Sequence, residues 1–316
     1  MNNKFIPNLK TLSKNPQRLS SGHKLCPGCG IGIILKQILT TIKEPIITAN
    51  ATGCSEICFS AYPHNSFRSS WIHSLFENAA SVISGIESAH KAMLKKNKLT
   101  AEQKKIKFLA LGGDGATYDI GFQWLSGAIE RGHDFVYICF DNEGYMNTGY
   151  QQSSSTPYGF STHTTPCGES LQGKIRHRKN LTKIIAAHDI PYVAQCNPSN
   201  YADLMKKAHK AFEIKGPAVL NCFSMCPTNW KFDPSDGLEI SKLATESNFW
   251  PLYEVEYGKW KINSPTPKNF TEKLELFLSK QGRTKHLLKK ENENILEELK
   301  RKIQEDFEFL KKMEGL

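Results

Sequence analysis

Two short polar segments, each placed directly after an apolar stretch, carry oxygen ligands suited to a divalent cation. Asp114 is the middle residue of a Gly-Asp-Gly triplet, and Asn142 follows 28 residues later in the tetrapeptide Asp-Asn-Glu-Gly. Mg²⁺ prefers octahedral oxygen ligation and is usually held by one or two protein oxygens together with substrate phosphates. The Asp114 carboxylate, the Asn142 amide oxygen and a backbone carbonyl near Gly144 therefore predict a site for magnesium and a diphosphate group.

The glycines of these segments support this interpretation, although the first segment alone is ambiguous. Gly113, Gly115 and Gly144 would let the backbone approach an anion closely, and a helix that starts soon afterwards would add its positive end. A Gly-Asp-Gly triplet by itself also makes ordinary turns. The second segment, at this spacing and after an apolar strand, favours the cation site.

Nine cysteines in a chain of 316 residues suggest a metal centre. Their odd number, without a secretory signal, argues against a disulfide framework. Cys26 and Cys29 form a Cys-x-x-Cys pair, Cys54 follows 25 residues later, and Cys226 lies far downstream. Four such thiolates bind either zinc or a [4Fe-4S] cluster, and the spacing alone leaves both open. A second Cys-x-x-Cys pair, usual in zinc ribbons, is missing from the sequence.

The remaining cysteines are expected to have no metal role. Cys222 is the chief rival of Cys226, but it sits inside an apolar strand, where a small buried thiol is the commoner explanation. Four others have neighbours typical of packing or loops, namely Cys58, Cys139, Cys167 and Cys196.

Alternating strands and helices predict an α/β fold with a mostly parallel sheet flanked by helices and a C-terminal helical tail. The expected strands are 45–51, 107–111, 135–141 and 217–223, and the expected helices are 31–42, 74–96, 122–131 and 200–214, the last with Asn200 as its cap. Ligands of open parallel sheets collect at the carboxyl ends of the strands. The predicted ligands should therefore meet in one crevice.

The chain divides into an N-terminal arm (1–22), a cofactor-binding domain (23–230) and a C-terminal extension (231–316). The Ser-, Thr-, Gly- and Pro-rich segment 151–178 is long enough to be a functional loop. Apolar residues recur at helical spacing in the tail and need a surface to cover, either on the protein's own body or on another subunit: Leu296, Leu299, Ile303, Phe307 and Leu310.

Composition restricts the partners. No segment approaches the roughly 20 apolar residues of a membrane span, which indicates a cytoplasmic protein. The formal net charge is +10, but no basic run with interleaved aromatic residues occurs, so a nucleic-acid partner is not expected. An acidic protein, such as a small electron carrier, would suit the charge.

The motifs together resemble the thiamine diphosphate enzymes, in which an Asn follows Gly-Asp-Gly at this distance. More narrowly, they resemble the β subunit of the 2-oxoacid:ferredoxin oxidoreductases, most closely the pyruvate-oxidising branch. The likeness covers most of the chain and includes the segments Cys26-Pro27-Gly28-Cys29-Gly30, Ala51-Thr52-Gly53-Cys54-Ser55-Glu56, Cys226-Pro227-Thr228, 71–80, 144–151 and 281–287.

This resemblance implies thiamine diphosphate, Mg²⁺ and a [4Fe-4S] cluster as cofactors. It assigns the cluster to Cys26, Cys29, Cys54 and Cys226, and magnesium to Asp114, Asn142 and Gly144. It implies oxidative decarboxylation of pyruvate with coenzyme A to acetyl-CoA and CO2, with electrons leaving one at a time. Asn147 is the implied catalytic residue, and the implied cofactor-binding residues are Gly53, Cys54, Gly113, Asp114, Gly115, Asn142, Gly144, Asn147 and Thr148.

The resemblance also implies that this chain is catalytically incomplete. In the family, the glutamate that activates thiamine belongs to an α subunit, and γ and δ subunits and a ferredoxin or flavodoxin are further partners. Glu56, Glu77 and Glu143 are expected here to be surface, helix-packing and turn residues. His73 is expected to cap a helix.

Three other readings remain open. The substrate could be 2-oxoisovalerate, 2-oxoglutarate or indolepyruvate. The chain could be a zinc-stabilised interaction subunit without a redox role, or a non-redox thiamine decarboxylase or carboligase. One departure from the family pattern is Asn229, which follows Cys226-Pro227-Thr228 where relatives typically have Gly, and it affects the expected loop geometry.

Overall fold

The computed structural model describes residues 5–61 and 63–315 and contains one eight-stranded sheet. The strand order is β2-β1-β3-β4-β6-β5-β7-β8. Neighbours from β2 to β5 are parallel, whereas β7 and β8 are added antiparallel. The predicted α/β fold with a mostly parallel sheet is therefore confirmed. The strands are β1 Ile46–Ala51, β2 Ser70–Ser74, β3 Lys107–Gly113, β4 Val136–Asp141, β5 Tyr192–Cys196, β6 Ala218–Phe223, β7 Tyr253–Glu256 and β8 Lys259–Ile262.

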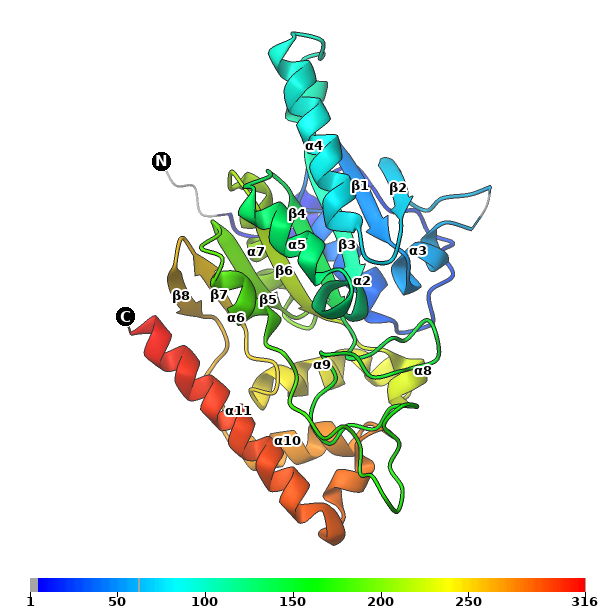
Figure 1. The fold of residues 1–316 in the computed structure, drawn as a ribbon, viewed down its shortest axis with the longest axis vertical. Coiled ribbons are helices and arrows are strands. Elements are labelled where there is room, and N and C mark those ends of the chain that lie inside the picture. The colour runs from blue at the N-terminus through cyan, green and yellow to red at the C-terminus, as the bar shows by residue number, and fades with distance from the viewer. Residues whose placement is uncertain (1–4, 62, 316) are drawn as a thin grey trace.

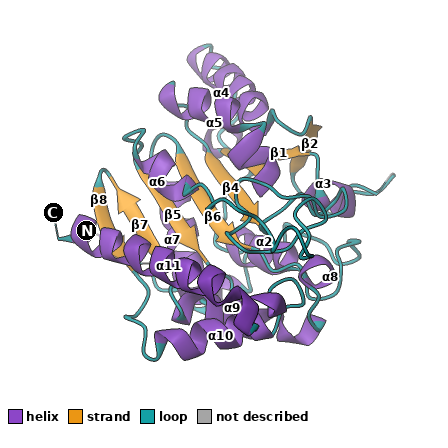
Figure 2. Cartoon of the chain, turned by 60° about the horizontal axis from the view of Figure 1, so that its bottom comes forward, coloured by secondary structure: helices purple, strands orange, loops and turns teal. Residues whose placement is uncertain are grey.

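Helices cover both faces of this sheet (Figures 1 and 2). They are α1 Leu9–Leu12, α2 Gly30–Leu39, α3 Cys54–Phe59, α4 Ala79–Lys95, α5 Phe122–Glu130, α6 Leu181–Ala186, α7 Tyr201–Glu213, α8 Pro227–Trp230, α9 Gly237–Glu246, α10 Phe270–Ser279 and α11 Glu293–Glu314. In β4, Ile138 belongs to the core with α2 and α7, and Tyr137 to the core with α4, α5 and α6. Successive residues of a strand point to opposite faces, so a continuous apolar run such as β4 is buried on both sides.

A third core lies beyond the carboxyl ends of the strands and is built largely by the C-terminal part of the chain. It combines α9, α10 and the first half of α11 with aromatic residues of the intervening loops. The apolar stripe of α11 is buried along its whole length, from Leu296 to Leu310. Figure 1 shows α11 running from the region below the sheet to its β8 edge. The tail therefore covers the protein's own body, which decides between the two surfaces considered for it.

Several predicted boundaries were wrong. The helix expected over 74–96 begins at Ala79, because residues 70–74 instead pair with β1 as the edge strand β2. Asn200 precedes α7 as expected, but its side chain makes no capping hydrogen bond. The strands β5, β7 and β8 were not predicted.

The proposed division at residues 22 and 230 stays a prediction. Residues 1–4 of the expected N-terminal arm lie outside the described residues. β7 and β8, beyond residue 230, extend the same sheet as the first part of the chain. Across 5–61 and 63–315, no helix has the length and apolar character needed to cross a membrane.

Two leucines of α10 provide a matched test of the third core. Leu278 is fully buried, whereas Leu276 is 42 % exposed. Leu278→Ala should lower the free energy of unfolding by about 2–5 kcal/mol, because it leaves a cavity. Leu276→Ala should change it by no more than about 0.5 kcal/mol. Urea unfolding followed by circular dichroism measures both, and equal effects would contradict the burial described for this helix.

Candidate active site

Asp114 and Asn142 lie next to each other at the carboxyl edge of the sheet. Asp114 follows β3 and Asn142 follows β4, which pair in parallel. The Oδ1 atom of Asn142 lies 2.8 Å from Oδ1 of Asp114 and 2.9 Å from the carbonyl oxygen of Gly144. Magnesium–oxygen distances of about 2.0–2.1 Å place adjacent octahedral ligands about 2.9 Å apart. The two distances from the Asn142 oxygen are therefore those expected between adjacent ligands of one magnesium ion.

The orientation of the Asn142 amide depends on whether a cation is bound. In the present orientation its oxygen faces only acceptor oxygens, and exchanging the amide oxygen and nitrogen would let the nitrogen donate to Asp114 and Gly144. A cation at the centre makes the present orientation favourable, because each oxygen then faces positive charge. The donor set thus fits magnesium with the amide as it stands.

The surroundings of Asp114 leave a negative charge to be compensated. Asp114 is buried, and burial together with the nearby Asp141 raises the pKa of its carboxyl well above the usual range. Ser153 donates to its Oδ2 atom at 2.5 Å. Asp141 is better satisfied, since the hydroxyls of Tyr118 and Ser155 donate to it. A divalent cation at Asp114 would offset the remaining cost of the buried charge.

All nine predicted cofactor-binding residues line one cavity of about 300 Å³: Gly53, Cys54, Gly113, Asp114, Gly115, Asn142, Gly144, Asn147 and Thr148. Its volume is at the lower end of those of small-molecule sites. Gly115 has to be glycine, because a Cβ atom there would lie 2.4 Å from the ring of Tyr145. Sequence reasoning missed several apolar wall residues, including Ile31, Phe76 and Met146.

The four predicted cluster cysteines also come together. Burial is the main cause that raises the pKa of the Cys29 thiol. Negative charge on Cys226, Cys54 or Cys26 raises it further. Burial, followed by negative charge on Cys226, Cys58 and Cys26, raises the pKa of Cys54 to about 12. The four side chains come from the turn before α2, the start of α3 and the start of α8. They are therefore close enough to interact electrostatically.

Two glycines allow the first cysteine turn to pack against the segment that carries Cys226. The backbone N–H of Gly30 donates to the carbonyl of Met225 at 2.9 Å. A Cβ atom on Gly30 would lie 2.7 Å from the Met225 nitrogen, and one on Gly28 would lie 2.5 Å from the carbonyl oxygen of Pro234. Gly28 also has a φ of +74°. Larger residues at either position would push the cysteine segments apart.

Within the described residues, no group of three or more His, Cys, Asp or Glu side chains is placed to hold one metal ion. Thiolates around one zinc ion would lie about 3.8 Å apart, given Zn–S bonds of about 2.3 Å, and a [4Fe-4S] cube holds its thiolates farther apart.

The other cysteines divide into two groups. Cys139, Cys196 and Cys222 are buried in the cores that flank the sheet, and Cys167 is exposed in a loop. Cys58 is half-buried one turn after Cys54, and the negative charges of Cys26 and Glu56 raise its pKa in addition to burial. The sequence did not indicate that Cys58 lies beside the predicted cluster ligands.

Three expectations for polar residues were wrong in part. Glu143 does lie in a turn, with φ 64°, but it is fully buried and pairs with Arg283 and Arg178. Glu56 is buried rather than on the surface. His73 lies in β2 and bonds to the hydroxyl of Thr52 at 2.6 Å, so it caps no helix.

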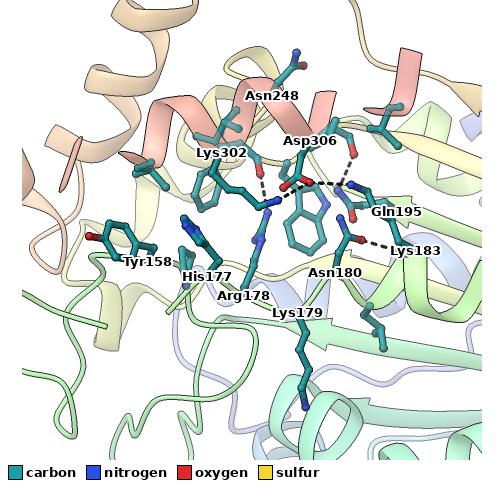
Figure 3. A pocket seen from close by; sticks show the side chains of 18 of the residues that line it. Tyr158, His177, Arg178, Lys179, Asn180, Lys183, Gln195, Asn248, Lys302 and Asp306 are labelled. Atoms are coloured by element: carbon teal, nitrogen blue, oxygen red, sulfur yellow. Dashed lines mark hydrogen bonds and ion pairs between the residues drawn. The ribbon is translucent and has the colours of Figure 1, made fainter. Parts of the chain in front are cut away.

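A second cavity, of about 90 Å³, lies beneath α11 and is shown in Figure 3. Asp306 of α11 accepts from Lys183 at 2.8 Å and from Lys302 at 3.1 Å there. Arg178 lines the same cavity and also reaches Glu143. It contains none of the predicted cofactor residues, and Lys183 of α6 attaches the C-terminal helix to the body.

Comparison with known proteins gives a consistent picture. Residues 51–222 match the family model described as thiamine pyrophosphate enzyme, C-terminal TPP binding domain. The chain is 43 % identical over 301 residues to the pyruvate synthase subunit PorB of Thermotoga maritima, covering 94 % of this chain and 92 % of that one. It is 41 % identical over 293 residues to the ketoisovalerate oxidoreductase subunit VorB of Pyrococcus furiosus, covering 93 % and 92 %.

Among solved structures, a similar fold is found in a 2-oxoglutarate:ferredoxin oxidoreductase from Magnetococcus marinus. That structure has 2-oxoglutarate, coenzyme A and succinyl-CoA bound. Its TM-score is 0.55 at 21 % identity, covering 71 % of this chain and 79 % of that one.

The buried carboxyl of Asp114 generates a test of the cation site. Asp114→Asn should abolish Mg²⁺-dependent binding of thiamine diphosphate, because a carboxylate ligand is lost. It should also stabilise the cofactor-free protein by about 1–2 kcal/mol, because it replaces a buried carboxyl beside Asp141 with a neutral amide. Titration calorimetry and urea unfolding in EDTA measure the two effects. Asp134→Asn, at a carboxylate that is 38 % exposed, is the control, and unchanged binding by Asp114→Asn would exclude the site.

Proposed function

This chain belongs to the thiamine pyrophosphate enzymes, in the family of the PorB and VorB subunits of 2-oxoacid oxidoreductases, and we propose that it is the β subunit of a pyruvate:ferredoxin or flavodoxin oxidoreductase. The complex would convert pyruvate and coenzyme A to acetyl-CoA, CO2 and a proton, and pass two electrons to the carrier. The observation that carries the proposal is the position of Cys54. It lines the cofactor cavity and is also a neighbour of Cys26 and Cys226.

In this proposal, oxygens of the cavity hold the diphosphate through magnesium. Asp114, Asn142 and the Gly144 carbonyl supply three ligands, and phosphate oxygens supply others. Bound thiamine diphosphate supplies a thiazolium that accepts the electron pair left when CO2 departs. Asn147 and Thr148, exposed where they line the cavity, would contact the thiazolium and diphosphate. The spacing of the three oxygens supports the magnesium assignment.

Electrons would leave through a [4Fe-4S] cluster bound by Cys26, Cys29, Cys54 and Cys226. Support comes from the mutual proximity of these cysteines and from the glycines that bring their segments together. A cluster beside the cavity accepts one electron at a time, which suits a one-electron carrier such as ferredoxin or flavodoxin. The nine free thiols fit a reducing compartment, and we place the complex in the cytoplasm.

The active site would be completed by an α subunit. Among the described residues that line the cavity, Asp114 is the sole carboxylate, and we assign it to magnesium. The glutamate that activates thiamine would then come from the partner. Large apolar side chains are exposed near β2 and α3, with Ile57 at 48 %, Ile72 at 46 % and Leu75 at 64 %. Such a patch suits a protein interface. We propose γ and δ subunits as further partners.

Substrate choice tests the assignment. The VorB relative makes 2-oxoisovalerate the main alternative, followed by 2-oxoglutarate and indolepyruvate. Steady-state turnover of the reconstituted complex with coenzyme A should show the highest kcat/KM for pyruvate. A preference for 2-oxoisovalerate by tenfold or more, equal to about 1.4 kcal/mol in the transition state, would replace pyruvate as the substrate.

Metal analysis tests the cluster. The complex purified without oxygen should contain about four irons and four sulfides per β subunit at this site. Cys29→Ser and Cys226→Ser should lose most of this iron and its electron paramagnetic resonance signal. Cys222→Ser, which alters a thiol buried in the core, is the matched control and should retain both. A colourless protein with one zinc ion would support the zinc-stabilised interaction subunit instead.

A further inference from the structure

A buried arginine from the C-terminal part of the chain reaches the residues between the two cofactor sites. Arg283 is 3 % exposed. Its Nη2 atom donates to the Glu143 carboxylate at 2.6 Å. The side-chain oxygen of Gln281 accepts from Nη2 at 2.9 Å and from Nε at 3.0 Å. Glu143 and Arg283 are separated by 140 residues in sequence. This ion pair thus joins the C-terminal segment to the turn that follows β4.

On one side, the ion pair fixes the turn that carries two predicted magnesium ligands. Glu143 stands between Asn142 and Gly144 and adopts φ 64°, a conformation that costs a residue with a side chain free energy. Its backbone N–H donates to Asp141 at 3.1 Å, and its carbonyl accepts from Thr156 at 2.8 Å. With its carboxylate held by Arg283, the turn keeps the Asn142 amide between Asp114 and the Gly144 carbonyl.

On the other side, the same guanidinium lies against the loop that carries Cys226. It lies 3.7 Å from the ring centroid of Trp230. The backbone N–H of Trp230 donates to the Cys226 carbonyl at 2.9 Å, and its indole N–H donates to the Asn142 carbonyl at 2.9 Å. Trp230 is therefore in contact with both segments and with the arginine.

We propose that Arg283 is a positioning residue shared by the two cofactor sites. Its ion pair with Glu143 holds the Asn142–Gly144 turn in the geometry that binds magnesium, and its charge raises the reduction potential of the cluster at Cys226. The inference rests on the proposed function, because it requires that magnesium diphosphate and the cluster both bind. Neither effect requires Arg283 to touch substrate or cofactor.

The two effects depend on different properties of arginine, so substitutions can separate them. Lysine keeps the positive charge but lacks the planar fork that contacts Glu143 and Gln281 together. Methionine replaces the apolar stem of the side chain and removes the charge. Arg178 provides a matched control, since it also pairs with Glu143, at 3.2 Å, but lies over Phe249 and Trp250 instead of Trp230.

The first measurement is the affinity of the complex for Mg²⁺ in the presence of thiamine diphosphate, by titration calorimetry. Arg283→Lys and Arg283→Met should each weaken binding by about 10–100-fold, as expected when a group that orients a metal ligand is lost. Arg178→Met should weaken it less, because Arg283 still holds Glu143. Wild-type affinity in both Arg283 variants would overturn the positioning role.

The second measurement is the cluster's reduction potential, by anaerobic redox titration followed by electron paramagnetic resonance. The reduced cluster carries one more negative charge, so a nearby cation favours it. Arg283→Met should lower the potential of the signal that Cys226→Ser removes, whereas Arg283→Lys and Arg178→Met should leave it close to wild type. An unchanged potential in Arg283→Met would overturn the electrostatic role.

Folding and function have separate controls. If Arg283→Met does not fold, the double variant Arg283→Met with Glu143→Gln removes both charges of the buried pair and avoids an unpaired carboxylate. It should show the same weaker Mg²⁺ binding and lower potential, and wild-type values in it would overturn the inference. A wild-type complex that binds neither magnesium diphosphate nor iron would instead refute the proposed function.

Discussion

Burial of the Asp114 carboxylate at the end of β3 is the constraint on which the site depends. The carboxyl lies beside Asp141 and next to the Asn142 amide. A buried carboxylate with a second carboxylate beside it is unfavourable without a cation. The surrounding structure prevents its collapse, because Tyr118 and Ser155 engage Asp141 and leave one edge of Asp114 free for a ligand. The site is therefore preorganised at some expense of stability.

The C-terminal third of the chain supplies much of this rigidity. β7 and β8 extend the sheet, while α10 and α11 build the core beyond the strand ends. From that core the segment 281–287 places a buried arginine against Glu143. Arg178, which lines the charged cavity beneath α11 (Figure 3), pairs with the same glutamate. An extension that looked in sequence like an appended tail thus supports the turn at the centre of the site.

Local patterns predicted what depends on neighbouring residues. The continuous apolar runs that became β1, β3, β4 and β6 mark strands buried on both faces, and the polar residues after them fall at one edge because the strands are parallel. β7 escaped prediction because its buried carboxylate has partners that are distant in sequence. Glu254 of β7, for example, is buried only because Tyr192 and Lys210 donate to it. Likewise, nothing near Glu143 in the sequence shows that it is buried, since Arg283 lies 140 residues away.

The cysteines show which contacts cannot be predicted from neighbouring residues in the sequence. The Cys-x-x-Cys pair and its glycines define a turn from sequence alone, but the choice of partners depends on which strand ends face it. Cys222 and Cys226 differ by four positions, yet the first lies within β6 and packs into the core, while the second begins α8 beyond the strand. Cys58 is near the predicted ligands because α3 turns it toward them, although it follows no metal-binding motif. The spacing of cysteines in the sequence suggests a set of candidate ligands. Which of them lie beside the cofactor cavity depends on which strand ends are neighbours at the edge of the sheet.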